Sequence, residues 1–444
     1  MKGEAQVAAA DGSMNFGETA PNGIFADMDF YDIIIIGGGA SGMCTAINAK
    51  TKNTSVLLID AHQRPGRKLL ATGNGRCNLT NEYCTYSLLN KNPEGIYPFF
   101  SEGKREFIEN VIKRYDCSCA CSFFEGMNLF LISKNGYVYP KTEQASTVLE
   151  ILEKQVKDLG IAVKPACRVR EVFKRNGSFI VNNEYAAKSL VLACGGLSSP
   201  KGDEDGSGYK IASAFGHSIL KPRPALCGIA CRGAFFRDIS AARQDGVLTL
   251  YAGTGSPLMK CSGNIQFTNY GISGIPAFQL SSEAGRLLEK NIKPEIEIDL
   301  FPGMPAKKIA DIIKDRKENF LLGIVNSSIA AGYEKILCKE GLKKGSSAYI
   351  NSLSKLVRGL RVEVQALPSF KNSQVTAGGI PTWEINAGTM ESLKTRGLYF
   401  TGEIMDVNGI CGGYNLQWAW STAFICAESL REKHDKDFGH MYKT

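Results

Sequence analysis

The sequence predicts an α/β protein built on a Rossmann-type dinucleotide-binding domain that is discontinuous, with an inserted β-rich and helical part. Three observations support this prediction. An apolar β-branched run at residues 33–36 ends in the pattern Gly37-x-Gly39-x-x-Gly42, a helical apolar pattern follows, and a second apolar strand ends in Asp60. Strand, glycine-rich turn, helix and terminal acid together are the context that the dinucleotide fingerprint requires.

Each glycine of the fingerprint has a physical task. The first permits a tight turn, the second lets the backbone approach a pyrophosphate, and the third lets the helix pack closely on the strand. The helix that starts near Ala40 and Ser41 then presents its N-terminus to the phosphate charge. A carboxylate about twenty residues further on is placed to bind a ribose hydroxyl. The pattern therefore predicts a dinucleotide site.

The composition is that of an ordinary soluble globular protein, with 22% charged and 44% hydrophobic residues among 444. This length predicts two or three domains. No apolar run is long enough to span a membrane, and residues 1–28 lack a hydrophobic signal core, so we interpret them as a disordered leader. The fourteen cysteines include Cys117-x-Cys119-x-Cys121, which differs from the usual CxxC zinc spacing. We predict buried thiols, no metal and a cytoplasmic location.

The chain after Asp60 continues the α/β pattern. A glycine-rich basic loop at 61–80 is interpreted as functional because long polar loops in compact domains usually are. Residues 143–159 have a helical apolar pattern, Asn176-Gly177 indicates a hairpin, and a buried strand at 190–193 follows.

Changes in pattern predict the domain limits. We expect residues 29–217 and 369–444 to form one discontinuous nucleotide-binding domain. Residues 218–283 alternate like antiparallel strands and predict an inserted β-rich domain, and residues 284–368 predict an inserted helical domain with lysine-rich faces.

Four sequence blocks carry a resemblance to a known family: the fingerprint, GNGRCNLTN at 73–81, FTNYGISG at 267–274, and TGEIMDVNGICGGYNLQWAW at 401–420. On these blocks the chain resembles the BaiN-like bacterial NAD(P)/FAD-dependent oxidoreductases, also described as aminoacetone-oxidase-family FAD-binding enzymes. They belong to the glutathione-reductase-type flavoproteins with two dinucleotide-binding domains. The resemblance implies one FAD per chain, with the flavin ring at the junction between the nucleotide domain and the insert. Because the chain has no second GxGxxG, NADH or NADPH is expected to bind only transiently as electron donor.

The resemblance also implies a reaction type. Members of the family reduce either a conjugated 3-oxo bile-acid intermediate or a uridine of ribosomal RNA, and both reactions saturate a C=C bond conjugated to a carbonyl. Such a bond accepts hydride from flavin N5 at its β-carbon, while the carbonyl oxygen is stabilised and the α-carbon is protonated. We expect a small enone substrate, with a 3-oxo-delta4/delta6 bile acid (steroid) intermediate as its named instance. Reduction of uridine to dihydrouridine is the alternative, and a non-catalytic FAD-binding protein is the second alternative.

By the same resemblance, three regions would hold the cofactor. The fingerprint, its acid and the strand near Gly195 would hold the ADP half, the loop around Arg76 would lie beside the flavin, and the segment around Glu403 would hold the second pyrophosphate and ribityl part. The helix after Gly413 would point its N–H groups at flavin N1 and O2. The complete expected set is Gly37, Gly39, Ala40, Ser41, Gly42, Asp60, Arg67, Lys68, Gly75, Arg76, Cys77, Asn78, Val169, Ala193, Gly195, Gly402, Glu403, Asp406, Gly413, Asn415 and Leu416.

No side chain stands out as the proton donor. His62 and His217 are candidates by residue type only, and Tyr270, Tyr414 and Cys77 are weaker ones. Cys77 is not part of a CxxC pair, which argues against a redox-active disulfide. The catalytic residues are therefore left unassigned.

Positive charge is concentrated in the insert. The stretch from Lys307 to Arg361 has twelve Lys and Arg against five Asp and Glu, a net charge of +7, and the whole chain is only +8. A solvated helical face is the usual explanation for such a run. A phosphate backbone, here ribosomal RNA, would select the same feature, so both interpretations remain open.

Overall fold

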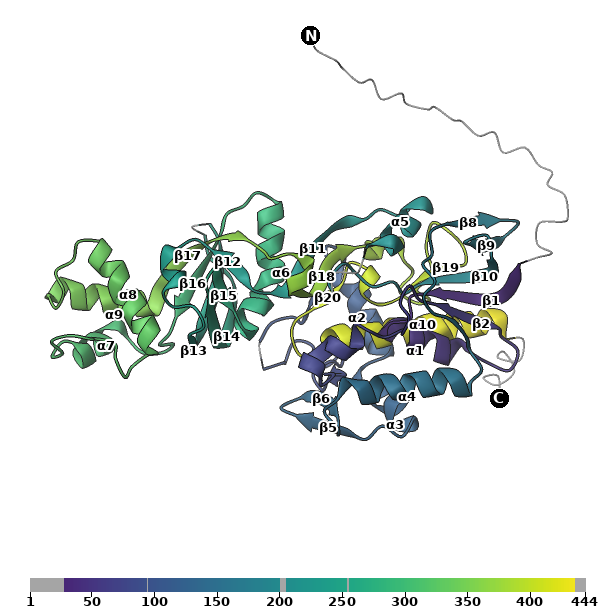
Figure 1. Cartoon of the computed structure of the whole chain (residues 1–444), viewed down its shortest axis with the longest axis horizontal. Coiled ribbons are helices and arrows are strands. Elements are labelled where there is room, and N and C mark those ends of the chain that lie inside the picture. Colours follow the sequence, from purple (N-terminus) through teal and green to yellow (C-terminus); the bar gives the residue numbers. More distant parts are fainter. Residues whose placement is uncertain (1–27, 94, 200–204, 254, 436–444) are drawn as a thin grey trace, which may run out of the picture.

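The structure is a computed structural model that describes residues 28–93, 95–199, 205–253 and 255–435. The predicted leader lies outside the described residues, apart from residue 28. Figure 1 shows an elongated molecule with a large sheet and its flanking helices at one end, a barrel further along, and a group of helices at the far end. Among the described residues, no helix combines the length and the apolarity that crossing a bilayer requires.

The large sheet is a Rossmann sheet. Its parallel strands are β7 (Ala162–Lys164), β2 (Val56–Ile59), β1 (Asp29–Ile36), β10 (Tyr185–Leu192) and β19 (Leu398–Phe400), and the antiparallel hairpin β9 (Ser178–Val181) and β8 (Val172–Arg175) continues from β10. Residues 33–36 are at most 7% exposed, as expected for a parallel strand covered on both faces. The predicted α/β Rossmann fold and the predicted hairpin are confirmed.

Helices cover this sheet. The glycine-rich turn leads into α1 (Ala40–Ala49), which packs against the long buried helix α10 (Tyr414–His434) and against α4 (Ala145–Asp158). The predicted helix at 143–159 is therefore confirmed. Smaller elements complete this part of the molecule: η1 (Leu69–Gly75), β3 (Thr80–Asn81), β4 (Phe99–Phe100), α2 (Arg105–Arg114), α3 (Cys117–Gly126), β5 (Leu131–Lys134), β6 (Tyr137–Pro140), α5 (Ser207–Ala214), η4 (Thr382–Glu384), η5 (Gly402–Ile404) and β20 (Asn408–Gly409).

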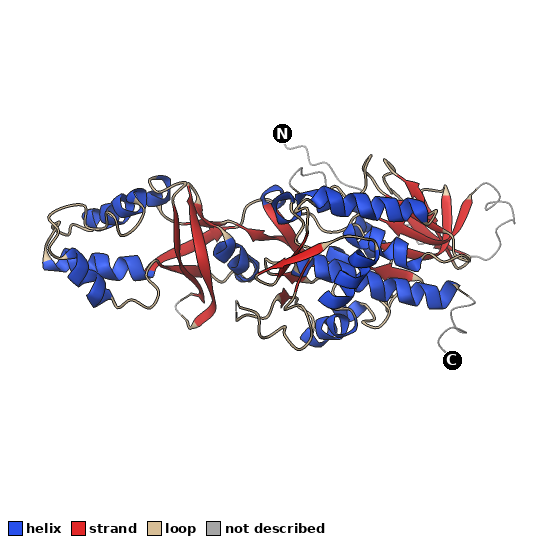
Figure 2. Ribbon diagram, turned by 90° about the horizontal axis from the view of Figure 1, so that it is seen from below, coloured by secondary structure: helices blue, strands red, loops and turns tan. Residues whose placement is uncertain are grey.

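Two antiparallel strands connect the Rossmann part to the insert. They are β11 (Leu220–Cys227) and β18 (Ser373–Gly379), and η3 (Phe370–Asn372) lies beside them. Beyond them a closed barrel has the strand order β12 (Ile229–Cys231), β15 (Gly271–Ser273), β14 (Pro257–Thr268), β13 (Arg243–Ala252), β16 (Pro294–Asp299) and β17 (Leu360–Ala366). Helix α6 (Ile275–Glu289) packs on the barrel, and η2 (Ala234–Arg237) precedes β13. Figure 2 shows the strands of the barrel between the Rossmann part and the distal helices.

The distal helices are α7 (Ala306–Ile313), α8 (Ser327–Lys339) and α9 (Ser347–Gly359), and they lie in the chain between β16 and β17. The barrel thus takes two strands from the segment 284–368, which the sequence analysis treats as helical. Buried apolar side chains form two large clusters, one in the Rossmann part and one in the barrel with its helices. The domain limits themselves stay a prediction.

Candidate functional site

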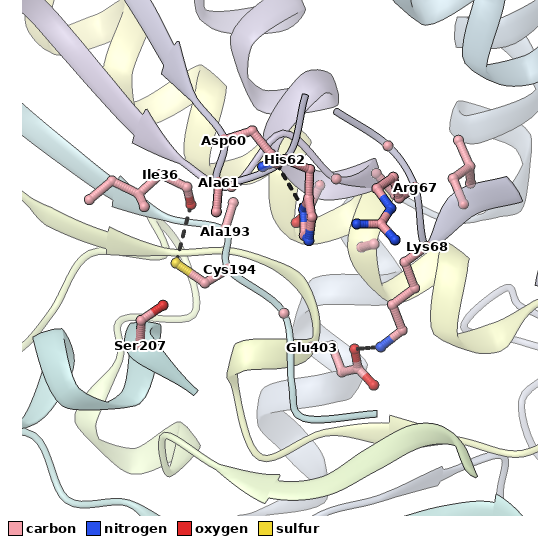
Figure 3. Close-up of a pocket in the computed structure, with 18 of the residues that line it drawn as sticks. Ile36, Asp60, Ala61, His62, Arg67, Lys68, Ala193, Cys194, Ser207 and Glu403 are labelled. Carbon is pink, nitrogen blue, oxygen red and sulfur yellow. Dashed lines mark hydrogen bonds and ion pairs between the residues drawn. The ribbon is translucent and has the colours of Figure 1, made fainter. Parts of the chain in front are cut away.

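A cavity lies at the carboxyl ends of β1, β2 and β10, where open α/β sheets bind their ligands. Figure 3 shows Asp60, His62, Lys68 and Glu403 around it. The structure brings thirteen of the predicted cofactor residues to its wall: Gly37, Gly39, Ala40, Ser41, Asp60, Arg67, Lys68, Val169, Ala193, Gly195, Glu403, Asn415 and Leu416.

The glycine-rich turn has the geometry of a phosphate cradle. Gly37 has φ +105°, and a Cβ there would lie 2.4 Å from the Ala193 carbonyl oxygen. A Cβ on Gly42 would lie 1.8 Å from the Gly37 carbonyl oxygen, whereas a Cβ on Gly39 would meet no heavy atom within 4 Å. Two glycines are therefore required by packing, and the third faces open space that a ligand can fill.

Two helices begin beside the cavity without a capping side chain at the N-cap position. The N-cap residues, Gly39 before α1 and Gly413 before α10, have no side chain that could accept a hydrogen bond from the first turn. No N-cap side chain therefore occupies the N–H groups of the first turn of α1 or α10, and the helix dipoles make both ends favourable for negative charge. This arrangement fits a dinucleotide, which carries a pyrophosphate.

Asp60 fastens the turn to the end of β2. Its Oδ2 accepts the Gly38 backbone N–H at 2.7 Å, and its Oδ1 accepts the His62 backbone N–H at 2.7 Å and lies 3.1 Å from His62 Nδ1. Because each carboxylate oxygen can accept two hydrogen bonds, Oδ2 retains capacity for a hydroxyl. The residue can therefore both fix the turn and bind a ribose.

Glu403 connects its own segment to three others on another wall of the cavity. Its Oε2 lies 2.5 Å from Lys68 Nζ and accepts the Gly196 backbone N–H at 3.3 Å, and its Oε1 accepts the Thr376 backbone N–H at 2.8 Å. The Lys68–Glu403 ion pair is drawn in Figure 3. It places a fixed positive and a fixed negative group side by side in the cavity wall.

The remaining predicted cofactor residues do not line this cavity: Gly42, Gly75, Arg76, Cys77, Asn78, Gly402, Asp406 and Gly413. Arg76 is exposed, lies 5.4 Å from the Tyr139 ring centre, and is 3.9 Å from the Glu143 carboxylate. Cys77 is buried, and burial raises its pKa to about 12. The Asn78 amide, oriented to satisfy both of its atoms, accepts the Gly413 backbone N–H at 3.1 Å. Their part in cofactor binding stays a prediction.

The two histidine candidates differ in position. His62 lines the cavity at its nucleotide end. His217 is buried away from it, with Nδ1 2.9 Å from Glu384 Oε2 and Nε2 2.7 Å from Ser392 Oγ. Burial lowers the pKa of His217, and the carboxylate partially opposes that shift. Its hydrogen bonds indicate a structural role.

The sequence analysis missed several residues that line the cavity: Thr72, Cys194, Asp205, Ser207, Gln374 and Val375. Cys194 lies two residues after the end of the buried strand β10, close to the position that Gly37 has after β1, and that signal could have indicated it. Gln374 and Val375 belong to the connecting strand β18, and no local sequence signal assigns them to the cavity.

The fold and the cavity define a protein of the Rossmann class, with a nucleotide-type cavity and an inserted barrel. Residues 31–429 match the family described as "HI0933-like protein Rossmann domain". The match extends over most of the chain, so the protein belongs to this family. The resemblance drawn from the four sequence blocks is thereby confirmed.

Two curated relatives match nearly end to end. The chain is 33% identical over 415 residues to a 3-dehydro-bile acid delta(4,6)-reductase of Clostridium scindens, covering 90% of this chain and 98% of the relative. It is 28% identical over 422 residues to a ribosomal RNA dihydrouridine synthase of Escherichia coli K12, covering 91% and 98%.

Two solved structures match most of the chain weakly. A flavocytochrome c3 fumarate reductase has a TM-score of 0.46 at 15% identity, over 93% of this chain and 80% of the other. A 3-ketosteroid delta1-dehydrogenase of Sterolibacterium denitrificans has a TM-score of 0.48 at 11% identity, over 91% and 100%. These likenesses are too weak to indicate a function.

Proposed function

We propose that this protein is an FAD-dependent oxidoreductase that reduces a C=C bond conjugated to a carbonyl. The observation that carries the proposal is the open space in front of Gly39, between two uncapped helix N-termini, at the carboxyl ends of parallel strands. The 33% identity to a bile-acid reductase supports the type of reaction. NADH or NADPH is the proposed electron donor.

Each wall of the cavity has a proposed task in holding FAD. The turn at Gly39 and the N-terminus of α1 would bind the pyrophosphate, and Asp60 would bind the adenosine ribose. Lys68 and Glu403 would meet the middle of the cofactor, where phosphate charge and ribityl hydroxyls need a donor and an acceptor. The N-terminus of α10, beside Leu416, would stabilise negative charge on the reduced flavin ring.

When bound and reduced, FAD would supply a hydride to the substrate. The chain itself must keep the cofactor in place, orient the substrate and provide the second proton. A 3-oxo bile-acid intermediate with delta4 or delta6 unsaturation is the proposed substrate, because this chain matches 98% of the length of the 3-dehydro-bile acid delta(4,6)-reductase.

Reduction of uridine in ribosomal RNA is the second candidate, and the basic stretch of the insert favours it. In that stretch Lys344 lies 3.0 Å from the Glu334 carboxylate, and Arg358 lies 3.3 Å from Asp299. The exposed lysines of the stretch that make no ion pair within the described residues include Lys307, Lys308, Lys343 and Lys355. They are the groups that would meet phosphates.

The test is an anaerobic half-reaction. Purified protein should release FAD on denaturation, and NADH or NADPH should bleach the bound flavin. A Δ4-3-oxo steroid such as 4-androstene-3,17-dione should then restore the oxidised spectrum, and unmodified ribosomal RNA should not. Re-oxidation by RNA alone would favour the second candidate, and a protein without FAD would exclude both.

A further inference from the structure

A second cavity lies at the junction between the Rossmann part and the insert. Its walls come from β4, β20, β11 and α6. Figure 1 shows β20, β11 and α6 between the large sheet and the barrel. The residues that form it are Phe99, Phe100, Ser101, Glu102, Arg223, Ser282, Glu283, Arg286, Asp406 and Asn408. Two aromatic side chains and an unusual concentration of charge therefore share one small space.

Asp406 is the most deeply buried acid of this cavity, at 2% exposure. Its Oδ2 accepts the Glu102 backbone N–H at 2.7 Å and the Ser101 hydroxyl at 3.1 Å. Within the part of the chain that the structure describes, Oδ1 has no hydrogen-bond partner. Burial raises the pKa of Asp406 to about 6, although the hydrogen bonds and Arg223 oppose the shift. Near neutral pH this carboxyl can therefore gain and lose a proton.

Arg223 supplies the positive charge. Its side chain is 13% exposed, and one terminal nitrogen, Nη1, pairs with Glu289. Its Nε is buried and has no partner among the described residues. The other guanidinium in the cavity, that of Arg286, is bound by Glu283 at 2.8 and 2.5 Å. Within the described residues neither Nε nor Nη2 of Arg223 makes a hydrogen bond, and Nη2 is not enclosed as Nε is. The Arg223 guanidinium therefore retains a donor that a ligand in the cavity can use.

The two cavities are linked through the chain. Glu403 lines the nucleotide-type cavity, and Asp406, three residues later, lines the junction cavity. Strands β11 and β18 connect them from the other side, because Val375 lines the first cavity and pairs with Ala225, two residues after Arg223. The family resemblance implies that the flavin ring lies at this junction, and a substrate in the junction cavity would then be held beside it.

We propose, on the basis of the proposed function, that the junction cavity receives the carbonyl end of the substrate. The Arg223 guanidinium hydrogen-bonds the carbonyl oxygen, and the Asp406 carboxyl donates a proton to the α-carbon. Both residues are catalytic in this assignment, and neither has a role in holding the ADP half of FAD.

A bound, reduced FAD would supply the hydride, with its two electrons, that adds to the β-carbon as the C=C π bond breaks. The electron pair moves onto the carbonyl oxygen, where Arg223 stabilises the negative charge of the enolate. The enolate then takes the Asp406 proton at its α-carbon, which gives the saturated ketone and a carboxylate, and solvent reprotonates the carboxylate.

Other charged groups face Asp406 and shape its titration. Glu102, on the same wall, raises the pKa of Asp406, and Arg223, on β11, lowers it. Glu283 and Arg286, on α6, neutralise each other, and Lys290 lies 3.8 Å from the Glu102 carboxylate. The acid form should therefore decline above about pH 6, and the rate of substrate reduction should decline with it.

The test compares Asp406→Asn and Arg223→Gln with Asp238→Asn, an exposed acid on the insert that pairs with Lys335. All variants are first checked for FAD content. Reduced enzyme is then mixed with 4-androstene-3,17-dione across a pH series. Loss of general acid catalysis predicts at least a roughly 100-fold slower re-oxidation for Asp406→Asn, without the wild-type decline above about pH 6. Arg223→Lys, which keeps the charge, should restore part of the Arg223→Gln loss.

A binding measurement keeps the inference separate from the proposed function. Phenol presents a polar oxygen on an apolar ring, as an enone does, and it can be titrated into oxidised, FAD-loaded protein by calorimetry. We expect Arg223→Gln to weaken phenol binding at least tenfold, and Asp238→Asn to leave it unchanged. If the steroid re-oxidises the wild type, and Asp406→Asn keeps the wild-type rate and pH profile, the inference is overturned while the proposed function stands. If the steroid does not re-oxidise the wild type, the proposed function is contradicted. Phenol binding that is absent in the wild type, or unchanged in Arg223→Gln, would then overturn the inference as well.

Discussion

Replacing Gly39 by valine isolates cofactor binding from folding. Gly39 has φ −78° and ψ −166°, an extended conformation that valine adopts readily. A Cβ there meets no heavy atom within 4 Å. The variant should therefore keep the free energy of unfolding of the cofactor-free protein within about 1 kcal/mol of the wild type.

The same substitution should greatly weaken FAD binding. The valine methyl groups would occupy the space assigned to the pyrophosphate and would hold it away from the backbone N–H groups. A hydrogen bond to a charged group contributes about 1.5–3 kcal/mol, and about 1.4 kcal/mol corresponds to a factor of ten in Kd. Loss of one or two such bonds predicts a Kd that is roughly 10- to 10,000-fold higher.

Unfolding in urea with and without FAD measures both effects. At a free FAD concentration of about 100 times the wild-type Kd, the wild type should gain about 2.7 kcal/mol of stability, and the valine variant should gain at most about 1.4 kcal/mol. Gly42→Val is the matched control, because its Cβ would lie 1.8 Å from the Gly37 carbonyl oxygen. It should lower stability even without FAD. Wild-type FAD content in Gly39→Val would refute the cradle assignment.

Three further predictions concern other parts of the molecule. Burial raises the pKa of Asp406 from 3.8 to about 6. The free energy of unfolding of the wild type should therefore fall as pH rises from about 4 through about 6. Between about pH 4 and about pH 7, the free energy of unfolding of Asp406→Asn should rise by about 3 kcal/mol relative to that of the wild type, measured by urea unfolding. A difference that does not change with pH would contradict the raised pKa of Asp406. Leu416→Pro removes one N–H from the first turn of α10 and should lower the flavin potential by roughly 6–40 mV, whereas Leu416→Ala should not. Equal potentials in a folded, FAD-loaded Leu416→Pro protein would place the helix end elsewhere. Changing Lys307, Lys308, Lys343 and Lys355 to Glu should leave steroid turnover unchanged; a large loss of RNA affinity and of its salt dependence, together with lost RNA reduction, would instead support the RNA candidate.

The features that the sequence predicted well are local ones. The strand at 33–36, the turn at Gly37 and the helix after it follow from neighbouring residues, and the acid at the end of the next strand completes the same unit. The hairpin at Asn176-Gly177 is predicted for the same reason. In each case the residues that determine the structure lie within a few positions of it.

The features that the sequence did not predict depend on distant contacts. Strand β16 alternates apolar and polar residues, but its place in the barrel depends on pairing with β13 and β17. Asp406 is next to the cofactor motif in sequence, yet it faces the junction cavity because Ser101 and Glu102 hold its carboxylate. The local sequence can show that a segment alternates like a strand, but it does not specify which strands pair with it.

The nucleotide-type cavity is built from both ends of the chain, and this determines when the protein can bind a cofactor during its synthesis. The walls of the nucleotide-type cavity come from residues as early as Ile36 and as late as Ala419. About 350 residues separate Asp60 from Leu416, and at about 5–20 residues per second a ribosome needs roughly 20–70 s to make them. Within this interval the ribosome finishes the insert before it has made the last elements of the Rossmann part. The barrel with its own buried cluster can fold first, and the cofactor must wait for the last helix.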